Sequence, residues 1–98
     1  MNIFYIYILK CADDSYYIGH TDNLEKRLSE HYDASACLYT KSRLPVKLVY
    51  SEIFSTRTEA FNAEHKIKKW TRFKKELLIN EGWQALQSWK LFKKINNF

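Results

Sequence analysis

The stretch that decides the fold runs from Phe4 to His31 and reads FYIYILKCADDSYYIGHTDNLEKRLSEH. Its first part, Phe4 to Leu9, is a β-branched and aromatic run of strand length, too short for a buried helix of usual size. The same chemistry returns at Tyr16 to Ile18, after the break Asp13-Asp14-Ser15. These two runs predict a β-hairpin.

The loop of this hairpin decides how its two tyrosines are oriented. Side chains alternate between the two faces of a strand. An even loop at Asp13-Asp14 pairs Lys10 with Tyr17 and places Tyr7 and Tyr17 on opposite faces. An odd loop or a bulge places both tyrosines on one face.

After Gly19 the pattern takes the period of a helix. Asp22 and Glu25, three residues apart, have the form of a capping box, in which Asp22 supplies the acceptor for the free backbone N–H groups. Leu24 and Leu28 make the apolar stripe of this helix.

Arg27 and His31 stand four residues apart on the flank of that stripe, so they are neighbours on one helix face. Together with Tyr5-Ile6-Tyr7 and Tyr17-Ile18-Gly19, which are separated by nine residues, this pattern resembles the GIY-YIG nuclease domain. The second triplet matches the name outright, whereas Tyr5 stands where the family often has Gly. The resemblance is greatest to small stand-alone bacterial members, and it extends from Phe4 to about Ile79.

The segment from Tyr32 to Leu44 has no clear period and is predicted to be a loop closed by Pro45. Its TKSR part, Thr40 to Arg43, concentrates hydroxyls and cations suited to phosphate oxygens, although a solvated loop has the same composition. Val46 to Phe54 alternates like a third strand. One face of this strand is expected to carry Val46, Leu48 and Tyr50.

A second helix is predicted after this strand, because Thr56 and Glu59 offer another capping box. Its apolar stripe consists of Ala60, Ala63, Ile67 and Trp70. Glu64 falls inside the stripe, where a carboxylate loses hydration at a cost that a cation or a metal must offset. The alternative for Glu64 is an exposed i,i+4 pair with Lys68.

Residues 66–75 read KIKKWTRFKK and carry six basic residues interleaved with Trp70 and Phe73. On a helix such a run is most often a solvated face, but beside a nuclease site the same charges neutralise phosphates. The predicted nucleic-acid-binding residues are Lys41, Arg43, Lys66, Lys68, Lys69, Arg72, Lys74 and Lys75.

Gly82 has the character of a helix stop signal. We therefore expect a nuclease-like domain over residues 1–82 and an amphipathic C-terminal helix over residues 83–98, packed on the same domain. This helix is expected to use Leu86, Trp89 and Phe92 on its apolar side, with Lys90, Lys93 and Lys94 beside them. An alternative is that its apolar side docks a protein partner.

The resemblance implies roles for particular residues. The family implicates the tyrosines of both triplets, which correspond here to Tyr7 and Tyr17, and it binds a divalent metal, Mg²⁺ or Mn²⁺, through a Glu that matches Glu64. Arg27 is always charged and can donate hydrogen bonds to two oxygens at once, so it would hold the scissile phosphate. His31 matches a position where relatives carry Tyr or His. The positions expected to support the site are Gly19 and Asn80.

The general base stays open between Tyr7, Tyr17 and His20. A tyrosine with an ordinary pKa near 10 is ionised in only about 0.1% of molecules at pH 7, so a phenolate base costs about 4 kcal/mol unless the site lowers that pKa. His20, with an ordinary pKa near 6.5, needs no such help and stands where relatives often carry Lys. Either tyrosine could instead be an aromatic core residue.

The bulk composition favours an anionic partner, because the 98-residue chain carries a net charge of +5. DNA is the first candidate and an acidic membrane surface is the second. Cys11 and Cys37 lack metal-ligand spacing and suggest reduced cytosolic thiols. The longest apolar run, Ile3 to Leu9, is far shorter than a membrane span, so a cytoplasmic location without membrane insertion is expected.

The sequence thus predicts an α+β domain with a small three-stranded antiparallel sheet flanked by helices. Its predicted activity is that of a Mg²⁺-dependent DNA endonuclease that recognises structure more than sequence. Two alternatives remain. One is a non-catalytic nucleic-acid-binding module with the same fold, and the other is an interaction protein that docks through its C-terminal helix. The oligomeric state is not indicated by any pattern.

Overall fold

The computed structural model describes the backbone of residues 2–95 and the side chains of residues 2–88. The chain divides into two compact units, of which the first ends at Lys68 and the second begins at Lys69. Within the described residues, the helices are too short or too polar to cross a membrane.

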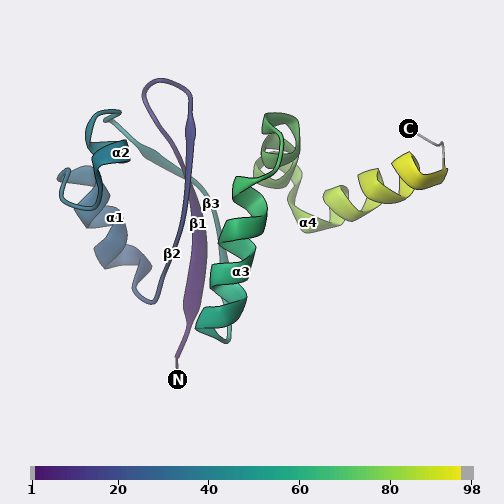
Figure 1. The fold of residues 1–98 in the computed structure, drawn as a ribbon, viewed down its shortest axis with the longest axis horizontal. Helices are drawn as coiled ribbons and strands as arrows, with labels where there is room; N and C mark the ends of the chain where they lie inside the picture. Colours follow the sequence, from purple (N-terminus) through teal and green to yellow (C-terminus); the bar gives the residue numbers. More distant parts are fainter. Residues whose placement is uncertain (1, 96–98) are drawn as a thin grey trace. The chain divides into compact units, whose positions relative to one another are not determined.

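The first unit is built around a three-stranded antiparallel sheet. Its strands are β1 (Phe4–Lys10), β2 (Tyr16–Thr21) and β3 (Lys47–Phe54), in the spatial order β2-β1-β3. Its helices are α1 (Leu24–Tyr32), α2 (Leu38–Lys41) and α3 (Arg57–Lys68). Figure 1 shows α1 and α2 beside one face of the sheet and α3 beside the other. The predicted α+β class is confirmed.

The loop of the β1-β2 hairpin is odd. Lys10 pairs with Tyr16, which leaves five residues between them, and Leu9 pairs with Tyr17. Directly opposite residues share a face, so Tyr17 lies on the same face as Leu9 and Tyr7. The even-loop register, which would separate the two tyrosines, is excluded.

The third strand departs from simple alternation. Ile8 pairs with Tyr50, whereas the next residue, Leu9, pairs with Leu48, and this shift marks a β-bulge. Because the bulge adds one residue to β3, Leu48 and Tyr50 face opposite sides of the sheet. The prediction that they share a face is wrong, because simple alternation does not anticipate an unpaired residue.

Each face of the sheet buries its own layer of side chains. On the side of α1, the buried cluster consists of Tyr7, Leu9, Cys11 and Val46. Leu24 and Leu28 of α1 pack against this cluster. On the other side, α3 packs against all three strands. The fully buried residues there are Ile6, Ile8, Ala60 and Ile67. The sheet therefore separates two layers, which can meet only around an edge strand such as β2.

Helix α1 is capped one residue later than predicted. Asn23, not Asp22, is the N-cap residue, and its side-chain oxygen accepts from the Lys26 backbone N–H at 3.1 Å. Asp22 is instead engaged in an ion pair, because Arg57 Nη2 lies 3.1 Å from its carboxylate. Both residue types suit an N-cap, so the sequence alone did not separate them.

Helix α3 begins with the predicted pair of capping residues. The Glu59 backbone N–H donates to Thr56 Oγ1 at 3.1 Å, and the Thr56 hydroxyl donates to Glu59 Oε1 at 2.9 Å. The helix ends at Lys68, so the predicted extension to Trp70 is wrong. The basic run 66–75 is consequently divided between the two units and does not form one helical face.

The segment from Tyr32 to Leu44 is not wholly a loop, because it contains the one-turn helix α2. Thr40 within α2 is fully buried. The expectation that the Thr40 hydroxyl is available to phosphate oxygens is therefore wrong. A one-turn helix leaves no periodic pattern in the sequence, which is why this element was not predicted.

The second unit contains α4 (Arg72–Ile95), which is interrupted at Gly82. Gly82 has φ 84° and ψ −176°, a conformation that glycine adopts readily, so the predicted helix stop is confirmed. The rings of Trp70 and Trp83 meet edge to face 5.6 Å apart within this unit. The predicted faces formed by Trp89, Lys90, Phe92, Lys93 and Lys94 lie outside the described side chains. Packing of residues 83–98 on the first unit stays a prediction.

Candidate active site

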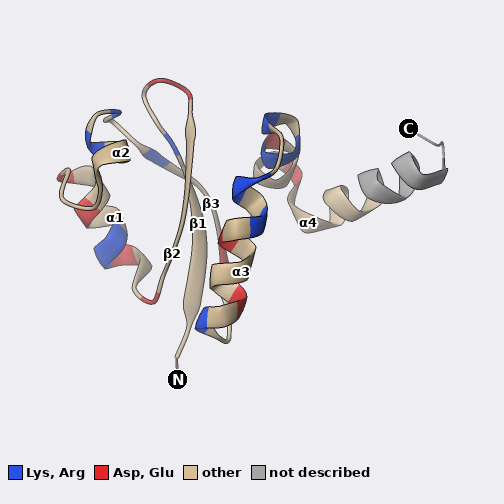
Figure 2. Ribbon diagram, viewed as in Figure 1, with Lys and Arg blue, Asp and Glu red and all other residues tan. Residues whose placement is uncertain are grey.

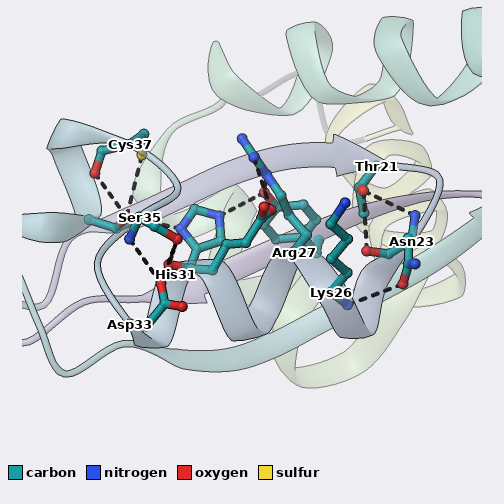
Figure 3. A network of polar contacts seen from close by, with 11 residues as sticks. Thr21, Asn23, Lys26, Arg27, His31, Asp33, Ser35 and Cys37 are labelled. Atoms are coloured by element: carbon teal, nitrogen blue, oxygen red, sulfur yellow. Dashed lines mark hydrogen bonds and ion pairs between the residues drawn. The ribbon is translucent and has the colours of Figure 1, made fainter.

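The Tyr7 hydroxyl is the centre of a buried polar network. It lies 2.9 Å from His31 Nε2 and 3.4 Å from Arg27 Nε. Figure 3 shows the Arg27 and His31 side chains extending from the same helix, α1, into one network of contacts. Tyr7 and His31 are fully buried, whereas the Arg27 side chain is 33% exposed. The two residues predicted to share a helix face thus meet at one phenol.

The absence of a side chain at Gly19 leaves space for the Tyr7 ring. The two residues are cross-strand partners, and a Cβ atom at position 19 would lie 2.5 Å from the Tyr7 hydroxyl oxygen. Real Cβ atoms essentially never approach that closely. The ring can therefore lie across β2 only because residue 19 has no side chain.

The hydrogen bonds around His31 fix its tautomer. Tyr7 is fully buried and Arg27 can only donate, so the acceptor for the phenolic proton is His31 Nε2. The neutral ring then carries its proton at Nδ1, which donates to Thr40 Oγ1 at 2.9 Å. The Thr40 hydroxyl donates in turn to the carbonyl oxygen of Cys37 at 3.5 Å. The network thus directs the Tyr7 proton inward, away from solvent.

Burial keeps this network neutral. Desolvation raises the pKa of the Tyr7 phenol, against the lowering effect of the Arg27 guanidinium. Desolvation also lowers the pKa of His31, and the positive charge of Arg27 acts in the same direction. The Tyr17 ring lies edge-on to His31, with centroids 5.1 Å apart, and burial raises the pKa of Tyr17 as well. At neutral pH both phenols are protonated and the imidazole is uncharged.

A charged cluster lies on the α3 side of the sheet. Glu64 is only 6% exposed, and its carboxylate accepts from His20 Nδ1 at 2.8 Å and from Lys68 Nζ at 3.0 Å. His65 Nδ1 lies 3.5 Å from the same carboxylate. Burial alone would raise the pKa of Glu64, but the hydrogen bonds from His20 and Lys68 hold it below its usual value. Burial of Glu64 and its pairing with Lys68, posed as alternatives by the sequence, occur together.

The two clusters meet at the edge strand β2. His20 follows Gly19, so its side chain points to the face opposite Tyr7. His20 and Arg27 nevertheless line one cavity of about 350 Å³. The cavity walls are His20, Thr21, Asp22, Asn23, Lys26, Arg27, Glu30 and Arg57. Arg27 connects this cavity to Tyr7, and His20 connects it to Glu64, so groups from both faces converge on one space.

The cations predicted to bind nucleic acid have different surroundings. Arg43 Nε donates to Asp13 at 2.9 Å, and its guanidinium lies 3.8 Å above the centre of the Tyr39 ring. Lys68 is bound to Glu64. Lys41, Lys66 and Lys69 are exposed in the first unit or at its boundary. Residues Arg72, Lys74, Lys75 and Asn80 belong to the second unit. The functional roles of all these residues stay predictions.

Three residues have positions in the site that sequence reasoning did not predict. Thr40 is the buried partner of His31, but a separation of nine residues gives no periodic signal. Lys26 lines the cavity beside Arg27, and its adjacency in the helix was the available signal. Arg57 reaches the same cavity from the start of α3, and no local pattern connects it to α1.

The residues present fit a hard divalent cation only as a single-carboxylate site. Mg²⁺ prefers oxygen ligands and commonly keeps several waters, with one or two carboxylates and substrate phosphates completing its coordination. Glu64 offers one such carboxylate, and no group of three or more His, Cys, Asp or Glu suited to a metal occurs among residues 2–88. Lys68 Nζ occupies one oxygen of the Glu64 carboxylate, and it must move away from that oxygen before a metal can bind there. The Lys68 side chain is 49% exposed.

The site geometry and the fold define a GIY-YIG domain. Residues 3–76 match the family described as the GIY-YIG catalytic domain. The chain therefore belongs to the GIY-YIG family.

Among its relatives, the chain is similar to proteins named UPF0213. It is 51% identical over 80 residues to the UPF0213 protein of Bacillus licheniformis, and the matched region covers 82% of this chain and 82% of the relative. It is 49% identical over 80 residues to the UPF0213 protein YazA of Bacillus subtilis, covering 82% of this chain and 81% of the relative.

Two solved structures, both determined by solution NMR, share the fold. The UPF0213 protein of Bacillus halodurans is 36% identical with a TM-score of 0.54, covering 82% of this chain and 86% of that one. A protein from E. faecalis is 39% identical with a TM-score of 0.56, covering 93% of this chain and 90% of that one.

Proposed function

We propose that this protein is a divalent-metal-dependent endonuclease that hydrolyses DNA phosphodiester bonds and selects DNA by structure more than by sequence. The observation that carries the proposal is the convergence of Arg27, which is bonded to Tyr7, and His20, which is bonded to Glu64, on one cavity. Hydrolysis of a phosphodiester needs a bound phosphate, an activated water and a stabilised leaving group, and these residues can serve such needs.

Arg27 is assigned to the scissile phosphate. Its guanidinium is always charged, and its planar fork of donors matches two phosphate oxygens. The hydrogen bond from its Nε to Tyr7 orients the group, and the two side chains of the ion pair with Glu30, 3.5 Å apart, are each about one third exposed. A phosphate can therefore replace Glu30 as the anionic partner of Arg27 at little cost.

Glu64 is assigned to the metal, Mg²⁺ or Mn²⁺. When bound, the metal would neutralise charge on the phosphate and lower the pKa of a coordinated water. In its absence His20 and Lys68 compensate the carboxylate charge, so the buried acid is stable in the free protein. His20 keeps its place between Glu64 and the cavity.

Tyr7 is the better placed of the two phenols to accept a proton from the nucleophile. Its own proton is already directed at His31 Nε2, so transfer to that nitrogen frees the phenol oxygen without involving solvent. The buried pair is neutral at rest, and an anionic phosphate bound at Arg27 favours a positive charge on His31. Tyr17 packs edge-on against the His31 ring and holds its orientation.

The test is a cleavage panel over duplex, flap, branched and single-stranded DNA with Mg²⁺, Mn²⁺ or chelator. We expect metal-dependent cleavage of branched or flap DNA, loss of cleavage in Glu64→Gln, and DNA binding by that variant within about twofold of wild type, because the lost contact is to the metal. Glu25→Gln, which removes an exposed carboxylate from α1, is the matched control and should cut normally. Cleavage by Glu64→Gln at the wild-type rate would refute the assignment.

A non-catalytic nucleic-acid-binding module is the second candidate function. It is favoured by one observation, which is that the Glu64 carboxylate is already bonded to two side chains of the protein, His20 and Lys68. The same panel separates the two candidates, because such a module binds DNA and cuts none of the substrates with either metal. A docking role for the C-terminal helix predicts instead that truncation after Gly82 abolishes assembly with a protein partner.

A further inference from the structure

The cavity at the β2 edge continues beyond the residues that the proposed reaction uses. A second hollow of about 280 Å³ shares two wall residues with it, Asp22 and Arg57. The remaining walls of this second hollow are Asn2, Ile3 and Phe4. The two hollows together are called the Arg57 groove. We propose that the Arg57 groove binds the backbone of one nucleic-acid strand next to the scissile phosphate, with Arg57 holding a neighbouring phosphate. This inference rests on the proposed function.

The charges of the groove suit an anionic chain. Three cations line it, namely Lys26 and Arg27 from α1 and Arg57 from the first turn of α3. Figure 2 shows basic segments on α1 and at the start of α3, away from the basic stretch where α3 ends. Lys26 and Arg27 are adjacent in sequence, whereas Arg57 joins them only through the fold. The groove therefore gathers positive charge from two separate elements.

The acidic residues of the groove do not block this role. Asp22 holds Arg57 in an ion pair at 3.1 Å, but the two side chains are 63% and 55% exposed. Exposed ion pairs of this kind contribute little net stability, so a phosphate can displace the carboxylate. In the free protein Asp22 keeps the Arg57 side chain at the junction of the two hollows.

A strand fits the groove better than an isolated anion does. Arg27 lines only the first hollow, whereas Arg57 lines both, so the cations are arranged in series. Beyond them the Phe4 ring lies 4.9 Å below the Arg57 guanidinium, and Ile3 is 38% exposed. Single-stranded nucleic acids are bound by this combination, in which cations contact phosphates and aromatic or apolar side chains contact bases. An isolated phosphate carries no base that could contact the apolar side chains of Ile3 and Phe4.

The binding test uses the full chain, a fluorescently labelled single-stranded oligonucleotide and chelator, so that binding is measured without cleavage. Arg57→Ala should weaken binding roughly tenfold, the value of one charge-assisted hydrogen bond, and should reduce the slope of log affinity against log salt by about 0.7. Arg57→Lys should keep the slope, because the charge remains. Asp22→Asn should tighten binding, because Arg57 is released and a negative charge is removed.

Lys47→Ala is the matched control, because Lys47 is an exposed cation of β3 that lies outside the groove and outside the predicted nucleic-acid-binding residues. Its affinity should stay near that of wild type, and thermal unfolding of each variant checks that it folds. Unchanged binding by Arg57→Ala, or equal losses in Arg57→Ala and Lys47→Ala, would overturn the Arg57 groove. Displacement of the oligonucleotide by inorganic phosphate at an equal concentration of phosphate groups would also overturn it, since that result identifies a site for isolated anions.

The binding role of the Arg57 groove and the proposed reaction can be refuted independently of each other. If Arg57→Ala binds weakly but the wild-type protein cuts no DNA with either metal, the groove stands as a binding site and the proposed reaction is wrong. If the wild-type protein cuts DNA and Arg57→Ala binds and cuts equally well, the reaction stands and the groove is wrong.

Discussion

The two faces of the sheet carry opposite kinds of polar chemistry. On the α1 side, Tyr7, His31 and Thr40 are fully buried in a neutral network in which each proton has an acceptor. On the α3 side, Glu64 is buried as a charged carboxylate and is compensated by His20 and Lys68. A neutral network needs only hydrogen-bond partners, whereas a buried charge needs opposite charge. One face therefore orients groups and the other holds charge, and the cavity at the β2 edge is lined by residues connected to both, Arg27 and His20.

The largest expected effect on stability is that of Gly19→Ala. The added methyl would lie 2.5 Å from the Tyr7 hydroxyl, which cannot move without leaving His31. We expect a loss of about 1–3 kcal/mol in the free energy of unfolding, as for other overpacked cores, together with loss of activity. Thermal or chemical unfolding measures the first effect.

Gly82→Ala is the control for that substitution. Among the described residues, and apart from its own chain neighbours, no atom lies within 4 Å of a Cβ at position 82, so the strain of this substitution comes from the positive φ of 84°. The expected cost is about 1–2 kcal/mol without a change in DNA cleavage. If Gly19→Ala is as active as Gly82→Ala, the tight contact of Tyr7 across β2 is not needed for function.

Substitution of Thr40 is expected to have the next largest effect, and it tests the neutral network. Thr40→Val removes the acceptor for His31 Nδ1–H, which leaves a buried donor without a partner and should cost about 1–3 kcal/mol. Thr40→Ser keeps the hydroxyl and should restore most of the stability and activity. The ¹⁵N shifts of the His31 ring report the tautomer directly, and a proton on Nε2 in the wild-type protein would contradict the assignment.

The smallest expected effect is a pH dependence of stability that differs between the two faces. The pKa of His31 and the pKa of Glu64 are both lowered by folding, so in both cases the unfolded chain binds the proton more tightly. Stability is then fully present above the unfolded pKa and falls as the pH is lowered, below about 6.5 for His31 and below about 4.5 for Glu64.

Variants should separate these two pH windows. His31→Gln should flatten the unfolding free energy just below about pH 6.5, whereas Glu64→Gln should flatten it only below about pH 4.5. Denaturant unfolding at a series of pH values measures both slopes. A slope near pH 6 that survives in His31→Gln would mean that another group produces it.

The sequence predicted best where the pattern was local. The alternation of Phe4 to Leu9, the YIG triplet and the spacing of Arg27 and His31 were each contained in one element, and each was found where expected. The Thr56 and Glu59 cap and the break at Gly82 also follow from local backbone requirements. Local geometry was therefore sufficient for most elements.

Prediction failed where two elements had to be combined. The bulge that separates Leu48 from Tyr50 depends on how β3 pairs with β1. The hydrogen bond of His31 with Thr40, and the presence of Arg57 and Arg27 in the wall of one cavity, depend on packing between segments that share no period. The sequence identifies the acidic and basic groups. It does not predict which of them pair across the edge of the sheet.

The most direct test of the account is single-turnover cleavage of branched DNA in Mg²⁺ by Arg27→Ala, Glu64→Gln and the double variant. Each single substitution should slow cleavage by about 10²–10³-fold or more, and the double variant should be no slower than the slower single variant, because both residues serve one step. Losses that multiply in the double variant, or a wild-type protein that cuts no branched DNA, would contradict the claim that the two faces of the sheet act together at the β2 edge.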